Sequence, residues 1–382
     1  MVCSKRTFLK ATALVAGGVA LGGPRGRALA GASTGGVQTA RKGLIRPRRS
    51  PWVTRLEGDR LQCTLCPKDC RLAPGQRGLC RVRENRQGEL VSLVHGTPVI
   101  LQMDPIERKP FFHVRPGSQS LSVSTAGCNF DCKFCEVWDT VLVAPEDIHA
   151  YDVPVGDVVR HAREAGAASI AYTFGEPVVF FEYMLDIARE ARQAGLLNLL
   201  HSNGYIRSAP LEALMPVLDG ANIDLKGFSE AFYRDVCAGE LQPVLDTLER
   251  LHAAGVHLEI TTLLIPTLND DLSMIKRMCG WIREHLGAET PLHLSRFYPL
   301  YKLADLPPTP VSSLERARDT ALAAGLNYVY LAKVPGHAAE TTRCAGCGQV
   351  VIERLGFVVD AVALEQDRCG HCGRRLPGVW EG

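Results

Sequence analysis

The sequence lacks a marked excess of charge of either sign, because 43 lysines and arginines nearly balance 41 aspartates and glutamates. The net charge of +2 provides no basic field, so the composition does not indicate nucleic acid as a partner. No G-x-G-x-x-G or P-loop pattern opens a predicted helix, which argues against dinucleotide-binding and P-loop folds. The composition is otherwise typical of a globular protein, with 46% hydrophobic and 22% charged residues.

Long hydrophobic runs are also missing. The weakly apolar run 11–23 holds thirteen residues, which is too short to span a bilayer. With its basic start and an A-x-A pattern at Ala28–Ala30, the region predicts a signal segment over residues 1–30 and no mature transmembrane segment. The stretch "SKRTFLK" resembles a twin-arginine export motif in which Lys5 replaces the first arginine. A retained leader explains these residues equally well.

Residues 31–56 are rich in glycine and arginine and carry no periodic apolar pattern. We expect a flexible linker there, and a nucleic-acid-binding arm is the weaker alternative. The rest of the chain divides into a cysteine-rich segment over 57–115, an α/β region over 116–335 and a cysteine-rich tail over 336–382.

Cysteine is abundant, with fourteen residues, and eleven of them fall into three local groups. Close C-x2-C and C-x3-C spacings in a chain of this size favour metal sites over a disulfide framework, which is typical of short secreted domains. The singles are Cys3, Cys237 and Cys279. The groups are Cys63, Cys66, Cys70 and Cys80, then Cys128, Cys132 and Cys135, then Cys344, Cys347, Cys369 and Cys372.

From about residue 119 to residue 333, short β-rich runs alternate with amphipathic helical runs. Repeated strand–helix units imply parallel strands, and six or seven units favour a full or partial TIM-like barrel of the (β/α)6 type. In such barrels the chemistry gathers at the carboxyl ends of the strands. The predicted strands are 120–124, 169–174, 197–202, 221–226, 257–265, 292–297 and 327–331.

The middle cysteine group lies just past the first predicted strand, in "TAGCNFDCKFCEVW". Thiolates spaced C-x3-C-x2-C on a compact loop can reach three corners of a [4Fe–4S] cube, which leaves the fourth iron free to accept a small molecule. The alternative is a zinc site that a remote residue such as His113 completes.

With Phe134 before its last cysteine, this motif resembles the hallmark of the radical S-adenosylmethionine (SAM) superfamily. The resemblance implies that SAM chelates the open iron through its amino and carboxylate groups, with Phe134 beside the adenine. It also implies that an electron from the reduced cluster cleaves the sulfonium, which gives methionine and a 5′-deoxyadenosyl radical.

Two further strand ends resemble the same superfamily. "YTFGEP" places Gly175 and Glu176 where the superfamily has a Gly-Glu motif, whose backbone and carboxylate meet the SAM amino group. A carboxylate beside an ammonium group is electrostatically favourable. "HSNG" places Asn203 where relatives contact the ribose hydroxyls, although Asn-Gly alone is also a common turn.

The next two strand ends resemble pyruvate formate-lyase activating enzyme and its relatives. "IDLKG" offers Asp224 and Lys226, two residues apart and therefore on one face of a strand. The resemblance makes them candidate catalytic residues near SAM and substrate, whereas an exposed ion pair is the structural alternative. "LLIPTLND" places Ile265 as a candidate adenine contact.

From about residue 55 to residue 358, the order of the motifs resembles the radical SAM enzyme of the AmmeMemoRadiSam system. The elements are "CTLCPKDCRLAPGQRGLCRVREN", "DPIERKPFFHVRPGS", "DLPPTPVSSLERA" and "VPGH" before C-x2-C-G. That family is named for its genomic association with Memo-like and AMMECR1-like proteins, and the resemblance does not settle its substrate. Two departures, Glu136-Val137 in "CEVW" and Gly175 before Glu176, lie near the expected SAM site and allow a different substrate class.

The two outer cysteine groups differ in pattern. "CAGCG" and "CGHCG", 21 residues apart, form paired knuckles that predict a zinc ribbon with a structural or partner-docking role; rubredoxin-like iron is the alternative. The amino-terminal group, C-x2-C-x3-C-x9-C, has enough thiolates for Zn²⁺ or for a second cluster, and its spacing does not decide between them.

These motifs predict a radical SAM enzyme that abstracts hydrogen from an organic or protein substrate. The alternatives are a glycyl-radical enzyme activase and, from another class, a non-catalytic iron–sulfur or zinc scaffold or an electron-transfer protein. We expect a low-potential electron donor as a partner, with Memo-like and AMMECR1-like proteins or a protein substrate as further candidates. SAM and low-potential electrons point to the cytoplasm, whereas the leader points to export.

Overall fold

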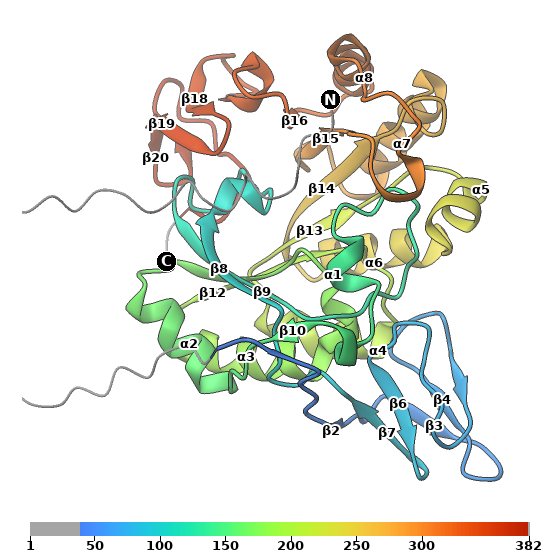
Figure 1. The fold of residues 1–382 in the computed structure, drawn as a ribbon. Coiled ribbons are helices and arrows are strands. Elements are labelled where there is room, and N and C mark those ends of the chain that lie inside the picture. The colour runs from blue at the N-terminus through green and yellow to red at the C-terminus, as the bar shows by residue number, and fades with distance from the viewer. Residues whose placement is uncertain (1–38, 381–382) are drawn as a thin grey trace, which may run out of the picture. The chain divides into compact units, whose positions relative to one another are not determined.

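The computed structural model describes residues 39–380, so the predicted signal segment lies outside the described residues. The main sheet has eight strands in the order β16-β15-β14-β13-β12-β11-β9-β8 (Figure 1). Strands β9 to β16 of this sheet pair in parallel, and β8 pairs antiparallel with β9. The strands are β8 (Ile100–Pro105), β9 (Gln119–Ser124), β11 (Ser169–Tyr172), β12 (Leu197–Ser202), β13 (Gly220–Asp224), β14 (His257–Leu264), β15 (Leu292–Arg296) and β16 (Val329–Ala332).

The seven parallel strands coincide with the seven predicted strands, and the α/β fold class is confirmed. Within the described residues the two end strands, β8 and β16, do not pair with each other, so the barrel is partial. Strand β8 comes from the segment that the sequence analysis assigned to the cysteine-rich region.

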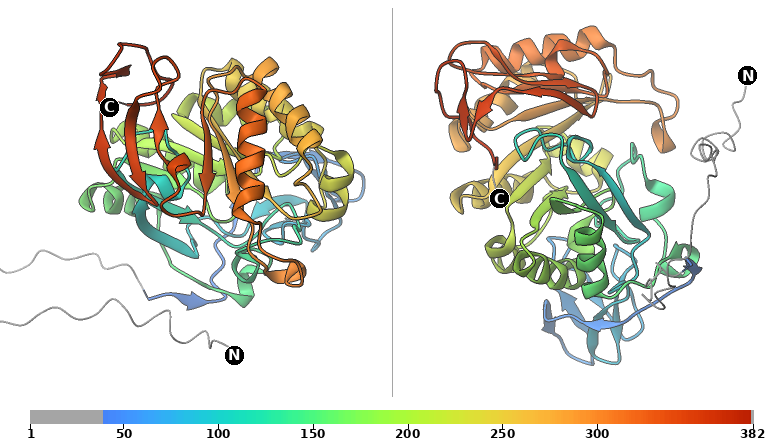
Figure 2. Two further views of the ribbon diagram at one scale, coloured as in Figure 1. Left: turned by 90° about the horizontal axis from the view of Figure 1, so that it is seen from above. Right: turned by 90° about the vertical axis from the view of Figure 1, so that its left-hand side faces the viewer.

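Six helices connect successive strands of the sheet. On α6, residues Val244, Leu248 and Leu251 follow the spacing of one helix face and are fully buried. The amino terminus of α7 is capped by Asp271, whose carboxylate accepts a hydrogen bond from the Met274 N–H at 2.8 Å. Helix α2 packs beside α3, and α7 packs beside α8 (Figure 2). The helices are α2 (Val155–Glu164), α3 (Phe181–Gln193), α4 (Ser208–Leu214), α6 (Gln242–Ala253), α7 (Leu272–His285) and α8 (Val311–Ala323).

Two small three-stranded sheets precede the barrel, and a third follows it. The tail packs through its own apolar cluster, which contains Phe112, Tyr328, Tyr330, Cys344, Val351, Cys369 and Leu376. None of the helices described here is long and apolar enough to cross a membrane. The small sheets are β2 (Arg48–Arg49) with β7 (Glu89–Ser92) and β6 (Arg83–Arg86), β3 (Val53–Arg55) with β4 (Leu61–Cys63) and β5 (Arg71–Leu72), and β17 (Thr342–Arg343) with β18 (Val350–Leu355) and β19 (Val358–Val362).

The linker prediction is wrong from residue 39 onward. Strand β1 (Arg41–Lys42) pairs with β10 (His149–Ala150), and β2 and β3 each join a small sheet. Three arginines of this segment, Arg41, Arg46 and Arg48, contact acidic side chains of the barrel region; the Arg46 guanidinium lies 2.5 Å from the Asp152 carboxylate.

A buried carboxylate, Glu259 on β14, anchors the chain that follows β8 to the sheet. It accepts hydrogen bonds from the backbone N–H groups of Phe112 (3.1 Å) and His113 (2.9 Å). It also lies 3.2 Å from the His257 ring and 2.6 Å from the His293 ring. Burial opposes ionisation, but hydrogen bonds from the two histidines outweigh it and hold the pKa of Glu259 well below its usual range.

We therefore expect Glu259→Gln to lower the free energy of unfolding at pH 7 by about 3 kcal/mol, the lower end for breaking a buried ionic contact. Because the pKa of Glu259 is lower in the folded state, its carboxylate stabilises the fold at every pH above the unfolded-state pKa of about 4.3. This contribution is lost as the pH falls through the pKa of the folded state. Urea unfolding at pH 7 and in acid measures the difference between the two proteins, which should shrink in acid.

Glu249→Gln is the matched control, because Glu249 forms an exposed contact with His285 at 2.6 Å. Exposed pairs contribute at most about 1 kcal/mol, so this variant should unfold nearly like the wild type. Equal losses in the two variants would contradict the anchoring role of Glu259.

Candidate active site

The loop that carries Cys128, Cys132 and Cys135 follows β9 directly. Its backbone is held from a second element, because the N–H groups of Asp131 and Lys133 donate to carbonyls of the π-helical turn Tyr233–Cys237 at 3.1 and 2.9 Å. This turn follows β13, so the strand bearing "DLK" also supports the cysteine loop. The buried Cys237 thiol lies beside Cys132; as a single cysteine, Cys237 gave no sequence signal of this contact.

The three sulfurs of this loop do not converge as closely as those of the tail cysteines. Within residues 39–380, no three of the cysteines outside the tail group have sulfurs that all lie within 4.8 Å of one another. Four sulfurs at about 2.3 Å from a single zinc would lie about 3.8 Å apart, whereas a cube of iron and sulfide holds its ligands at separate corners. Burial raises the pKa of Cys135 to about 11 and that of Cys128 well above its usual range, so these thiolates require a nearby cation. The loop therefore fits a [4Fe–4S] cluster.

The alternative with His113 as a fourth zinc ligand is wrong. The His113 ring is fully buried below the tail, where Nδ1 lies 2.7 Å from the Pro377 carbonyl oxygen and Nε2 lies 2.7 Å from the Tyr330 hydroxyl. Both ring nitrogens are thus occupied, and burial lowers the pKa of His113 to about 3.

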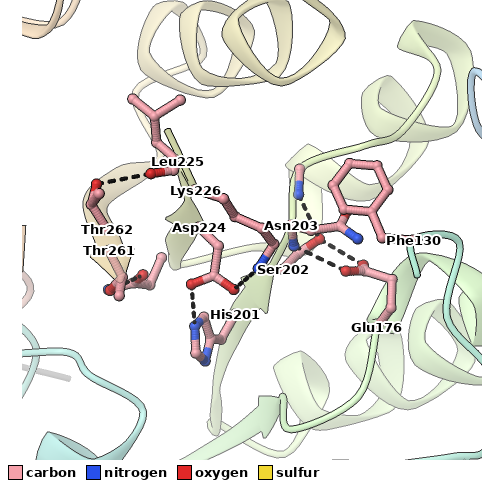
Figure 3. Close-up of polar contacts among 12 residues, drawn as sticks. Phe130, Glu176, His201, Ser202, Asn203, Asp224, Leu225, Lys226, Thr261 and Thr262 are labelled. Atoms are coloured by element: carbon pink, nitrogen blue, oxygen red, sulfur yellow. Dashed lines mark hydrogen bonds and ion pairs between the residues drawn. The ribbon is translucent and has the colours of Figure 1, made fainter. Parts of the chain in front are cut away.

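The Gly-Glu turn after β11 is packed against the strand ends beside it. A Cβ atom at Gly175 would lie 2.6 Å from the Ser124 hydroxyl oxygen, so the turn requires glycine. Glu176 is buried, and its carboxylate accepts hydrogen bonds from the Ser202 hydroxyl (2.7 Å) and the Asn203 N–H (2.9 Å), as Figure 3 shows. Burial raises the pKa of Glu176 despite these donors. The predicted contact of this turn with the SAM amino group stays a prediction.

Asn203 joins this turn to the cysteine loop. Its side-chain amide donates to the Asn129 side-chain oxygen at 2.8 Å, and Asn129 follows Cys128 directly. The Glu176 turn, the end of β12 and the cysteine loop are therefore connected by hydrogen bonds. Asn203 lies at the predicted place, and its predicted contact with a ribose is not tested.

A chain of polar side chains crosses the carboxyl ends of three strands. The Thr173 hydroxyl lies 3.1 Å from His201 Nδ1, and His201 Nε2 lies 3.1 Å from the Asp224 carboxylate. The other Asp224 oxygen accepts from Lys226 Nζ at 2.9 Å (Figure 3). Sequence analysis missed His201, although it precedes Asn203 by two residues and so shares its strand face.

The charges in this chain stabilise one another. Burial opposes ionisation of Asp224, but Lys226 and His201 outweigh it and hold the pKa of Asp224 far below its usual range. Burial also opposes the charge on Lys226, and Asp224 outweighs it, so the pKa of Lys226 is raised. The site therefore contains a fixed ion pair at neutral pH.

The predicted adenine contacts lie on either side of Lys226. Its ammonium group is 5.6 Å from the centre of the Phe134 ring, which is buried against Phe232. The fully buried Ile265 donates its N–H to the Asn269 side chain at 2.6 Å, and Asn269 donates in turn to the Lys226 carbonyl at 2.7 Å. Phe134 and Ile265 are thus both connected to Lys226, and their predicted contact with adenine stays a prediction.

Glu136 and Trp138, which follow the last cysteine of the loop, contact segments that follow the last two strands. Glu136 pairs with Lys333, which follows β16. Trp138 stacks on Tyr301 with 5.0 Å between ring centres. The segments after β15 and β16 therefore contact the cysteine loop at its carboxyl end.

The tail cysteines form a compact tetrad. Their four sulfurs all lie within 4.8 Å of one another, with 3.6 Å between Cys344 and Cys372 and 3.8 Å between Cys347 and Cys369. In each knuckle, the sulfur of the first cysteine accepts a hydrogen bond from a backbone N–H two residues further along the chain. Gly346 donates to Cys344 at 3.3 Å, and His371 donates to Cys369 at 3.4 Å. Burial opposes ionisation of Cys344, but the N–H groups of Cys347 and Gly346 lower its pKa to about 7. This geometry fits one tetrahedral ion.

The comparisons with known proteins agree with this geometry. A family model described as the Radical SAM superfamily matches residues 122–278. The chain is 40% identical over 331 residues to an uncharacterized protein of Methanocaldococcus jannaschii, covering 86% of this chain and 98% of that protein. It is 23% identical over 211 residues to the pyruvate formate-lyase 1-activating enzyme of Escherichia coli, covering 50% of this chain and 84% of that enzyme. A solved radical SAM methyltransferase from Sphaerobacter thermophilus has a TM-score of 0.47 and 16% identity, covering 80% of this chain and 81% of that one.

Proposed function

The chain belongs to the radical SAM superfamily, and we propose that it abstracts a hydrogen atom from an organic or protein substrate with a radical derived from SAM. The proposal rests on one observation: the cysteine loop, the Glu176 turn and the Asp224–Lys226 pair lie together at the carboxyl ends of the parallel strands. When bound, a [4Fe–4S] cluster and SAM supply the 5′-deoxyadenosyl radical.

The chain's own residues have separate tasks in this proposal. Cys128, Cys132 and Cys135 would hold three irons and leave the fourth open for SAM. The neighbouring Cys237 and burial raise the pKa of Cys132, and burial raises that of Cys135; the Lys226 charge opposes both shifts. The side chains of Phe134 and Ile265 are buried, and apolar groups that exclude water would protect a radical from quenching.

Five further residues would position SAM. Gly175 and Glu176 would bind its amino group through the backbone and the fixed carboxylate, while Asn203 would lie near the ribose. Phe134 and Ile265 would flank the adenine. Glu176, Asn203, Phe134 and Ile265 are buried, and Asn203 is hydrogen-bonded to the cysteine loop, which supports the assignment.

Within the superfamily, we assign the chain to the radical SAM enzymes of the AmmeMemoRadiSam type, on the order of the motifs in its sequence. A glycyl-radical enzyme activase is the second candidate, and one observation favours it. The "DLK" segment, which resembles the activases, is fixed against Phe134 of the cysteine loop. In that case a glycine of a partner protein would lose the hydrogen atom.

We further propose that the tail cysteines hold a structural Zn²⁺, because their 3.6 and 3.8 Å sulfur separations match tetrahedral coordination. The fold of the tail around the tetrad supports a structural role. A docking role toward a partner protein is compatible with the exposed Phe357 and Val358 of the same module.

Anaerobic reconstitution with iron and sulfide, followed by dithionite and SAM, tests the proposed chemistry. We expect 5′-deoxyadenosine and methionine in equal amounts, detected by mass spectrometry. A reducible cluster that binds SAM and yields neither product would refute the proposal. Addition of a glycyl-radical enzyme with deuterated glycine separates the two candidates, because only an activase would transfer deuterium into 5′-deoxyadenosine.

A further inference from the structure

The amino-terminal cysteines differ from the tail tetrad in the spacing of their sulfurs. In the tail, the measured sulfur–sulfur distances match those of four ligands around a single ion. No three sulfurs of the amino-terminal group, which belongs to the described part of the chain, lie within 4.8 Å of one another. They nevertheless surround one space, because a single cavity is lined by Cys63, Cys66, Cys70 and Cys80.

A buried donor without a partner lines the same cavity. The Arg83 side chain is 2% exposed, and its two terminal nitrogens contact Glu182 at 3.0 and 2.5 Å. Its Nε atom is buried and has no hydrogen-bond partner. Buried polar groups normally have partners, so an acceptor is expected in the cavity, and sulfide or thiolate sulfur would serve.

Backbone donors also converge on this cavity. The backbone N–H groups of Leu65, Lys68 and Val82 lie near the sulfurs of Cys63, Cys66 and Cys80, respectively, and favour their ionised forms, although burial raises the pKa of all three thiols. Lys68 lines the cavity as well, and the Arg83 guanidinium brings positive charge to Cys63 and Cys80. Hydrogen bonds and positive charge around the sulfurs are the means by which proteins hold and tune iron–sulfur clusters.

We propose that Cys63, Cys66, Cys70 and Cys80 hold a second iron–sulfur cluster and that zinc is confined to the tail. Four cysteines are the usual ligand set of both [2Fe–2S] and [4Fe–4S] clusters. The shared cavity of the four cysteines, the spacing of their sulfurs and the unpaired Arg83 donor fit such a cluster.

The second cluster would be a neighbour of the first. A Cβ atom at Gly127 would lie 2.9 Å from the Cys80 carbonyl oxygen and 2.8 Å from the Val82 side chain. Asn129 lines the cavity, so both residues that flank Cys128 contact the second site. Leu79, on the other side of the same cavity, is 64% exposed.

The test uses the full chain with Cys128, Cys132 and Cys135 all replaced by alanine, so it does not depend on the proposed radical chemistry. After anaerobic reconstitution we expect about two or four irons per chain with equal acid-labile sulfide, and about one zinc. Mössbauer spectra count the irons in each cluster. Additional Cys66→Ala and Cys70→Ala substitutions should remove the iron and sulfide and leave the zinc.

Cys279→Ala in the same background is the control, because Cys279 is a buried single cysteine on α7 and should leave the iron unchanged. Two zinc ions and no iron in the triple variant would overturn the proposal, and so would iron without sulfide. Circular dichroism would reveal whether the variant with all five cysteine substitutions folds. If it does not, the metal and sulfide content of the triple variant still distinguishes a second cluster from zinc.

Discussion

Replacing Cys132 with alanine is expected to reduce 5′-deoxyadenosine formation to the background without enzyme, a loss of more than about 1,000-fold. Enzymes typically accelerate reactions by a million-fold or more, and here the acceleration depends on a cluster with three protein ligands. Cys132 is the most buried of the three thiols, at 8% exposed, so water replaces its ligand atom poorly. Iron and sulfide analysis with a single-turnover assay measures the loss.

Cys369→Ala is the matched control, since it also removes one buried metal-binding cysteine. We expect it to release the tail metal and lower the thermal stability, because a structural zinc site contributes directly to folding. The iron content and the yield of 5′-deoxyadenosine per cluster should stay within about twofold of the wild type. Equal loss of iron in the two variants would contradict the assignment of separate sites.

The strands of the barrel could be predicted because each is a short apolar run with a turn signal on either side. Strand β12, for instance, was predicted as 197–202 and found as Leu197–Ser202. The cysteine motifs were equally accessible, since their chemistry depends on spacing within a few residues. The compact tail tetrad follows from two local knuckles, and its sulfurs meet as the pattern predicts.

The partners of the site residues could not be predicted, because they come from distant parts of the chain. Asn129 and Asn203 are 74 residues apart in sequence, and neither local sequence pattern predicts their contact. The contact of Cys237 with the cysteine loop depends on a π-helical turn, which no local pattern marked.

The incorrect linker prediction has the same physical origin. Residues 39–56 are polar and aperiodic, which is typical of a solvated linker. Their arginines are paired with carboxylates such as Asp152, 106 residues away from Arg46, and short strands fix the backbone. His113 was a zinc candidate for a related reason: its ring partners, Tyr330 and Pro377, lie more than 200 residues further along the chain.

Replacing Asp224 with asparagine should lower the rate of 5′-deoxyadenosine formation by about 100-fold or more while iron content is retained. The substitution leaves the Lys226 charge without its partner. Because Lys226 and Asp224 are 13% and 26% exposed, the cost should lie near the lower end of the range of about 3–5 kcal/mol for breaking a fully buried pair. Each 1.36 kcal/mol added to the activation barrier lowers the rate tenfold. A 100-fold loss therefore requires that most of the cost of breaking the pair raises this barrier. Rates per intact cluster, measured with saturating SAM and reductant, test the expectation.

The pH dependence gives an independent readout. In the wild type, Asp224 has a depressed pKa and Lys226 a raised one, so neither should titrate between about pH 6 and 9, relative to ordinary values of 3.9 and 10.4. In Asp224→Asn the largest contribution that raises the pKa of Lys226 is lost while burial still lowers it, so the variant should lose activity as the pH rises. A merely structural role would lower the rate without creating this new pH dependence.

Asp235→Asn is the control for Asp224→Asn, because Asp235 lies on the same segment but pairs with Arg234 at the surface, 58% exposed. It should match the wild type in rate and in pH profile. The double variant Asp224→Asn, Lys226→Gln removes both charges and should be less impaired than the sum of the single variants, because the two side chains act as one pair. Additive losses would mean that Asp224 and Lys226 contribute separately, and wild-type activity of Asp224→Asn would exclude the ion pair from the active site.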